Sequence, residues 1–201
     1  LQNLMQQVQI LLPPTPPNID WHHTLACRWR TMGKQGYLEA VNDLSPICLT
    51  DLQGIDRQKA EIRRNTAQFV QKSPANNVLL TGARGTGKSS LVKALVNEFG
   101  KEGLRVIEVD RDLLVDLPDI IKKIAHCPQR FIIYCDDLSF TADDASYRAL
   151  KTVLDGSLHA GSDNVLIYAT SNRRHLLPEY MSENLQSSVG EDGELHQIGR
   201  A

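Results

Sequence analysis

The residues best suited to chemistry form a glycine-rich loop between an apolar run and a helix-compatible segment. The loop reads GARGTGKS at residues 82–89, after the apolar residues 78–80 and before residues 90–96, and fits G-x-x-x-x-G-K-[ST] without a mismatch. Glycines let backbone N–H groups turn inward around phosphate oxygens, where a Cβ would obstruct the turn. The N-terminus of the following helix adds unpaired N–H groups and a partial positive charge. The pattern therefore predicts a phosphate-binding loop.

The side chains of the loop have distinct expected roles. Lys88 is expected to reach the β- and γ-phosphates of a nucleotide as a point charge, and the Ser89 hydroxyl is expected to ligate Mg²⁺. The alternative is a glycine-rich turn that fits the pattern by chance, which the complete pattern and both flanks disfavour. The other residues predicted to bind the nucleotide here are Gly82, Ala83, Arg84, Gly85, Thr86, Gly87 and Ser90.

A second group with chemical potential is a pair of acids at the end of an apolar run. Residues 130–137 read RFIIYCDD, which is typical of a Walker B strand. Ligands of parallel sheets bind outside the carboxyl ends of the strands. Asp136 is expected to hold Mg²⁺ through water, opposite Ser89, and Asp137 to orient or deprotonate the water that attacks the γ-phosphate. The alternative is that the two acids only cap a strand or begin a loop.

Asn172 is the third candidate, because it follows the next apolar run, NVLIYA at residues 164–169. Its amide is expected to position the attacking water or to contact the γ-phosphate. Asparagine is common in turns, so this prediction depends on the loop and on the acids.

The elements that must position these residues alternate between strands and helices. Each strand is an apolar run, as expected for strands that crossover helices bury on both faces. This alternation predicts a parallel sheet within a three-layer αβα sandwich. The expected elements are a helix within residues 54–70, a strand at 78–80, a helix ending near 100–103, a strand at 104–109, a helix through 118–124, a strand at 130–137, a helix at 143–159 and a strand at 164–169.

The sequence divides into three regions. Residues 1–17 carry helical spacing followed by a proline-rich segment, which predicts an appended helix and a stiff linker. Residues 18–53 are irregular and are predicted to be an N-terminal extension that packs on the core, anchored by Trp21 and Trp29. Residues 54–201 are predicted to be the nucleotide-binding core, and beyond residue 178 this core turns polar, as in a loop.

Composition excludes several classes of protein. The net charge of −2 gives no global reason to expect nucleic acid or an anionic membrane as partner. No stretch approaches the ~18 apolar residues that span a bilayer. The four cysteines are scattered without a C-x-x-C pair, so we expect reduced thiols in a cytoplasmic protein rather than disulfides or a zinc site.

Together these motifs resemble those of the AAA+ ATPases. GARGTGKS resembles Walker A, IIYCDD Walker B, YATSNRR the sensor 1 segment, and GID at residues 54–56 the element that lines the adenine pocket. Within AAA+, the phrases GIDRQKAEIRRNT, PANNVLLTGARGTGKSSLVKAL, CDDLSF and YATSNRRHLLPEYMSEN resemble the bacterial family catalogued as domain of unknown function 815. The resemblance covers roughly residues 20–200.

The resemblance implies binding and hydrolysis of ATP with Mg²⁺ as cofactor. It places the phosphates on residues 82–89 and Mg²⁺ on Ser89 and Asp136. The implied catalytic residues are Lys88, Asp137 and Asn172, the last as sensor 1. The implied apolar adenine pocket is made of Ile55 with Ile47 and Leu49.

Two departures from the AAA+ pattern stand out. Most AAA+ proteins have Glu where this sequence has Asp137, which places the carboxylate about one methylene farther from the water and predicts slow turnover. The sequence also ends before the arginine finger, the fifth strand, the helical lid and sensor 2 that a AAA+ module contains. With the AAA+ strand order 5-1-4-3-2, residues 78–81 are then expected at an open sheet edge, and the chain is expected to be part of a longer protein.

Two functions follow from the motifs. The first is an Mg²⁺-dependent ATP hydrolase that acts on a macromolecular partner and self-associates through AAA+ contacts. The alternative is a nucleotide-dependent switch or loader that binds ATP with little turnover and contacts nucleic acid through its arginines. A GTPase or a small-molecule kinase is disfavoured, since no N-K-x-D signature and no substrate lid are found. The arginines of the loader alternative are Arg28, Arg30, Arg63 and Arg64.

Overall fold

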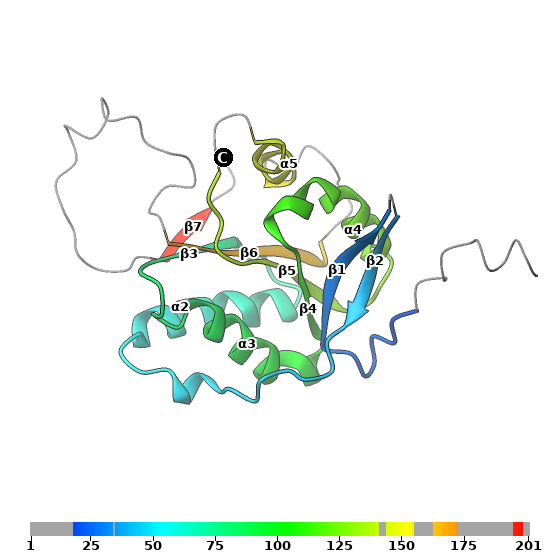
Figure 1. Cartoon of the computed structure of the whole chain (residues 1–201). Coiled ribbons are helices and arrows are strands. Elements are labelled where there is room, and N and C mark those ends of the chain that lie inside the picture. The colour runs from blue at the N-terminus through cyan, green and yellow to red at the C-terminus, as the bar shows by residue number, and fades with distance from the viewer. Residues whose placement is uncertain (1–17, 34, 141–143, 155–162, 173–194, 199–201) are drawn as a thin grey trace, which may run out of the picture.

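A seven-stranded sheet with helices on both faces organises the described part of the chain (Figure 1). The computed structural model describes residues 18–33, 35–140, 144–154, 163–172 and 195–198. The strands follow the order β2-β1-β4-β5-β6-β3-β7 across the sheet. They are β1 (Ala26–Met32), β2 (Gln35–Ala40), β3 (Asn77–Thr81), β4 (Leu104–Glu108), β5 (Arg130–Cys135), β6 (Val165–Ser171) and β7 (Leu195–Ile198), and the α-helices are α2 (Asp56–Val70), α3 (Lys88–Phe99), α4 (Leu117–Ile124) and α5 (Ala145–Leu154).

The centre of the sheet consists of four parallel strands in the order β4-β5-β6-β3. β3 leads through α3 to β4, β4 through α4 to β5, and β5 through α5 to β6. The carboxyl ends of all four strands therefore meet at one edge of the sheet. This is the 2-3-4-1 part of the order that the resemblance implies, and the prediction of a parallel αβα sheet is confirmed.

The two faces of the sheet carry separate hydrophobic cores. α2 and α3 cover one face, and α4 and α5 cover the other (Figure 1). In β5, Ile132 and Tyr134 belong to the core under α2 and α3, whereas Phe131 and Ile133 belong to the core under α4 and α5. Because successive side chains of a strand point to opposite faces, burial on both sides explains the unbroken apolar runs of the sequence.

The N-terminal region is more regular than expected. β1 and β2 form an antiparallel hairpin, and β1 pairs in parallel with β4, so the hairpin continues the sheet. Trp29 of β1 is buried, and its indole Nε1 donates a 2.9 Å hydrogen bond to the Asp116 carboxylate. Cys27 and Trp29 face the core while Arg28 between them does not. This alternation of apolar and charged residues in the sequence is a signal for a strand with one buried face.

The prediction that β3 lies at an open edge is wrong. β7 pairs antiparallel with β3, with Leu195 opposite Leu80. The strand has four residues and follows a long polar stretch, so hydrophobic periodicity could not reveal it. The appended helix and linker expected at residues 1–17 and the end of the helix expected at 143–159 lie outside the described residues.

The hairpin depends on a glycine that leaves space for an aromatic ring. A Cβ added to Gly36 of β2 would overlap the indole of Trp29. Trp29 is 1% exposed and cannot move without disturbing the core.

We expect Gly36→Ala to lower the free energy of unfolding by about 1–3 kcal/mol, measured by urea denaturation. The exposed neighbour provides the control: Gln35→Ala should change it by less than ~0.5 kcal/mol. Equal effects of the two substitutions would contradict this packing.

No helix in the described part of the chain is long and apolar enough to cross a membrane. All four cysteines are free, and Cys27 and Cys135 are fully buried in the core under α4 and α5. Burial raises the pKa of both thiols from 9.0 to about 12, because a thiolate is poorly solvated there.

These buried thiols predict a loss of stability in alkali. The unfolded chain ionises its thiols near pH 9 and the folded chain near pH 12, so their contribution is complete below pH 9 and is lost as the pH rises towards 12. Urea denaturation from pH 8 to 11 should show this fall in the free energy of unfolding. Cys27→Ala removes one such group, so we expect a shallower pH dependence even though the variant is less stable at neutral pH. An unchanged slope in this variant would refute the explanation.

Candidate active site

The glycine-rich loop connects the end of β3 to the start of α3. Gly85 and Gly87 both have φ of +83°, in the left-handed region that side chains disfavour, and Gly87 is the N-cap of α3. The loop thereby curls back over the helix N-terminus. The Lys88 Nζ donates hydrogen bonds of 2.7 Å to the Gly82 carbonyl and 2.8 Å to the Ala83 carbonyl. Lys88 is thus held against its own loop.

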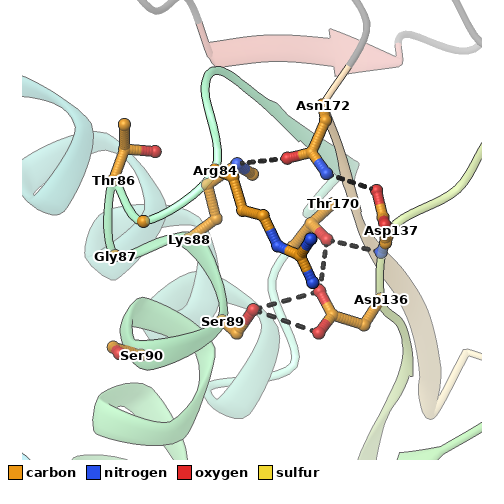
Figure 2. Close-up of a pocket in the computed structure, with 11 residues that line it drawn as sticks. Arg84, Thr86, Gly87, Lys88, Ser89, Ser90, Asp136, Asp137, Thr170 and Asn172 are labelled. Atoms are coloured by element: carbon orange, nitrogen blue, oxygen red, sulfur yellow. Dashed lines mark hydrogen bonds between the residues drawn. The ribbon is translucent and has the colours of Figure 1, made fainter.

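The Asp136 carboxylate joins three elements of the fold (Figure 2). It follows β5 and accepts hydrogen bonds from the Ser89 hydroxyl of α3, at 3.0 and 3.2 Å, and from the Thr170 hydroxyl of β6. The Tyr134 hydroxyl of β5 adds a bond of 2.8 Å. Burial of Asp136 opposes its ionisation, but these hydrogen bonds outweigh burial and hold the pKa of the carboxyl below its usual value. The group is therefore ionised at neutral pH.

Asp137 and Asn172 form a second polar pair beside Lys88. The Asn172 Nδ2 donates a 2.6 Å hydrogen bond to the Asp137 Oδ1, and its Oδ1 accepts one of 3.1 Å from the Lys88 Nζ (Figure 2). The Asp137 backbone N–H donates to the Thr170 hydroxyl at 2.8 Å. Asp137 has φ of +51°, a left-handed conformation in which Asp and Asn are enriched among residues other than glycine. The loop, the acids and Asn172, predicted separately, therefore lie together.

These groups surround an open cavity of about 280 Å³. Gly82 and Ala83 do not line it, although their carbonyls hold Lys88. Ile55 does not line it either; it is the N-cap residue of α2 and packs with Ile47 and Leu49 against the core under α2 and α3. The lining residues are Arg84, Gly85, Thr86, Gly87, Lys88, Ser89, Ser90, Asp136, Asp137, Thr170 and Asn172.

The apolar segment around Ile55 is nevertheless close to the loop. A Cβ added to Gly87 would lie 3.7 Å from the Leu52 side chain. The structure thus brings this segment beside the loop, outside the cavity itself. Its role as an adenine pocket stays a prediction.

Sequence reasoning missed Thr170 and Tyr134. Each lies on a strand, two residues before a predicted site residue that follows the strand, Thr170 before Asn172 and Tyr134 before Asp136. Residues i and i+2 of a strand point to the same face, so this spacing was the available signal. Burial raises the pKa of Tyr134, and the protonated hydroxyl serves as a donor to Asp136.

The residues at the cavity suit a magnesium ion. Within the described ranges no group of three or more His, Cys, Asp or Glu side chains could hold a metal ion by itself. Mg²⁺ in nucleotide sites keeps several waters and uses one or two protein oxygens together with the substrate phosphates. The Ser89 hydroxyl and the ionised Asp136 carboxylate provide such oxygens, 3.0 Å apart at their closest.

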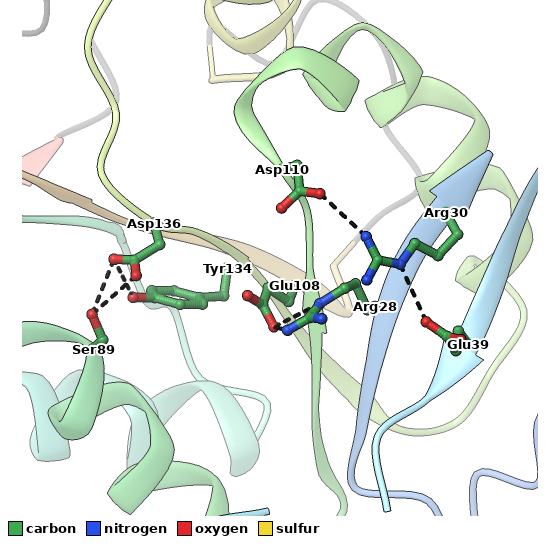
Figure 3. A network of polar contacts seen from close by, with 8 residues as sticks. All are labelled: Arg28, Arg30, Glu39, Ser89, Glu108, Asp110, Tyr134 and Asp136. Carbon is green, nitrogen blue, oxygen red and sulfur yellow. Dashed lines mark hydrogen bonds and ion pairs between the residues drawn. The ribbon is translucent and has the colours of Figure 1, made fainter.

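Three of the four arginines proposed for nucleic acid are paired with carboxylates. Arg28 pairs with Glu108 at 2.9 Å, and Arg30 lies 3.2 Å from Glu39 and 3.6 Å from Asp110 (Figure 3). Arg63 pairs with Glu98 at 2.6 Å. Their charges are compensated locally, so these arginines do not form a free basic patch.

Solved structures resemble the chain at low identity. A Rhizobiales Trip13 structure is 17% identical over 63% of this chain and 57% of its own, with a TM-score of 0.44. AMPPCP-bound DnaA from Aquifex aeolicus is 18% identical over 66% of this chain and 44% of its own, with a TM-score of 0.45. The chain thus spans less than two thirds of either protein. Similarity at this level carries no information on function.

A family match covers most of the sequence. A search among curated proteins found no match. Residues 22–199 match DUF815, described as a protein of unknown function. The match includes the glycine-rich loop, both acids and Asn172. The chain therefore belongs to the DUF815 family.

Proposed function

We propose that the protein binds Mg²⁺-ATP in this cavity and hydrolyses it as an ATPase of the AAA+ type. The observation that carries the proposal is the convergence of Lys88, the Ser89–Asp136 pair and the Asp137–Asn172 pair on one cavity at the carboxyl edge of the sheet. A chance glycine-rich turn would not bring these partners together.

The loop and α3 would bind the phosphates. The Gly85–Gly87 turn places backbone N–H groups at the N-terminus of a 12-residue helix, where partial positive charge favours anions. The ammonium of Lys88 is fixed within the loop by two carbonyls and approaches the phosphates from there. Mg²⁺ held by Ser89 and Asp136 would neutralise the phosphate oxygens when bound.

Asp137 would act on the attacking water. Asn172 donates to its Oδ1 and fixes the carboxylate in one orientation. The Oδ2 makes no hydrogen bond within the described residues, and we assign this oxygen to orienting or deprotonating the water. The Asn172 link to Lys88 couples the orientation of Asp137 to the group that reaches the γ-phosphate.

No observation favours the nucleic-acid loader. Its arginines Arg28, Arg30 and Arg63 are each paired with a carboxylate. A macromolecular target and self-association rest on the resemblance to AAA+ proteins alone. A cytoplasmic location rests on that resemblance and on the four free thiols.

The first test concerns nucleotide binding. Lys88→Ala removes the charge-assisted contact to the phosphates, so we expect affinity for Mg²⁺-ATP to fall about tenfold to a hundredfold in isothermal titration calorimetry. Lys93→Ala is the matched control, because Lys93 is exposed on the same helix and does not line the cavity. Equal affinities in Lys88→Ala and the unaltered protein would contradict the proposed site.

The second test separates hydrolysis from binding. Asp137→Asn retains an oxygen that can accept from Asn172 and a residue type that tolerates the left-handed backbone, but it removes the base. We expect ATP affinity to be kept and phosphate release to fall at least about a hundredfold. Turnover equal to that of the unaltered protein would exclude Asp137 as the base. Binding without measurable turnover in the unaltered protein would favour the nucleotide switch instead.

A further inference from the structure

Among the charged residues that line the cavity, Arg84 is the one without a partner in the described part of the chain. It lies in the loop between Ala83 and Gly85, is exposed, and lines the cavity. Figure 2 shows its side chain extending from the loop across the cavity, towards the side occupied by Asp136. Its guanidinium makes no hydrogen bond or ion pair with any residue that the structure describes.

The other charged side chains lining the cavity are all engaged. Lys88 donates to two carbonyls and to Asn172. Asp136 accepts from three hydroxyls, and Asp137 accepts from Asn172. A guanidinium that is held at a polar cavity and left without an anion is available to a negatively charged ligand.

The negative charge of a bound nucleotide and of the two carboxylates requires a second protein cation besides Lys88. The cavity has two cations, Arg84 and Lys88, and two carboxylates, Asp136 and Asp137. The triphosphate of ATP carries more negative charge than one Mg²⁺ neutralises, and the two carboxylates add to it. Lys88 supplies one compensating charge, and Arg84 is the remaining cation among the residues that line the cavity.

The position of Arg84 in the loop indicates which phosphate of a bound nucleotide it would contact. In this loop type, the backbone N–H groups near the helix surround the α- and β-phosphates, and the lysine reaches the β- and γ-phosphates. Arg84 precedes those N–H groups, and it lines the cavity together with Asp137 and Asn172, where the water would attack. A guanidinium can pair with two phosphate oxygens at once, which an ammonium cannot do.

We infer that Arg84 binds the terminal phosphate of a nucleoside triphosphate from within the same chain and makes the site prefer ATP over ADP. This inference rests on the proposed function, and it adds a residue that recognises the γ-phosphate. The site then carries its own arginine for that phosphate. The arginine also lies where it can stabilise the charge that develops during phosphoryl transfer.

The test compares two ligands on the full chain in the presence of Mg²⁺. The non-hydrolysable β,γ-methylene analogue of ATP has a terminal phosphonate, and ADP lacks the corresponding group. We expect Arg84→Ala to weaken binding of the analogue about tenfold to a hundredfold and to leave ADP affinity unchanged. Arg84→Lys keeps the positive charge but cannot pair with two phosphate oxygens at once, so its affinity for the analogue should lie between those of the unaltered protein and Arg84→Ala. Arg64→Ala, which removes an exposed arginine of α2 that does not line the cavity, is the matched control.

The outcomes distinguish this inference from the proposed function. If the unaltered protein binds neither ligand, the proposed function fails and the inference with it. If the unaltered protein binds the analogue and Arg84→Ala binds it equally well, the inference alone is overturned. An equal loss of analogue and ADP affinity also overturns it, because Arg84 would then act on the phosphates common to both or on the shape of the loop. Thermal melting without nucleotide checks that Arg84→Ala folds.

Discussion

The arrangement of the site depends on one carboxylate, that of Asp136, which is hydrogen bonded to three different elements. Ser89 reaches it from α3, Tyr134 from β5 and Thr170 from β6. These donors meet because β5 and β6 pair in parallel with Cys135 opposite Ala169, which brings their carboxyl ends level. A slip of one residue would turn Thr170 to the other face of the sheet. The register of two strands therefore fixes the geometry of the candidate active site.

Several charged side chains of the described residues form compensated groups. On β1, Arg28 pairs with Glu108 of the neighbouring strand β4, and Arg30 pairs with Glu39 of β2 and with Asp110 (Figure 3). Such partly exposed pairs contribute little to stability, but they compensate the charges of both arginines of β1. Of the charged side chains that line the cavity, only the Arg84 guanidinium has no partner among the described residues. An unmatched charge next to a polar cavity marks where an anion would be most strongly attracted.

The sequence was informative where physical patterns were long or chemically distinctive. The parallel strands are continuous apolar runs because both of their faces are buried, and the loop, both acids and Asn172 were predicted from motif and position. The hairpin of β1 and β2 was missed although Cys27 and Trp29 alternate with Arg28, because the segment was interpreted as irregular and Trp29 as an anchor. β7 was missed because four residues carry too little periodicity. The hydrogen bond of Thr170 to Asp136 joins two strands, and its local signal in the sequence was the two-residue spacing from Asn172.

The left-handed backbone of Asp137 bears on which acid this position can hold. With φ of +51°, the residue lies in a conformation that short polar side chains tolerate because they can hydrogen bond to the nearby backbone. Glutamate is not among the residue types enriched in this conformation. Its longer side chain would also have to give up the 2.6 Å contact with Asn172 or bend to keep it. The local path of the main chain is therefore a constraint on the acid at this position, separate from any role that the carboxylate has in chemistry.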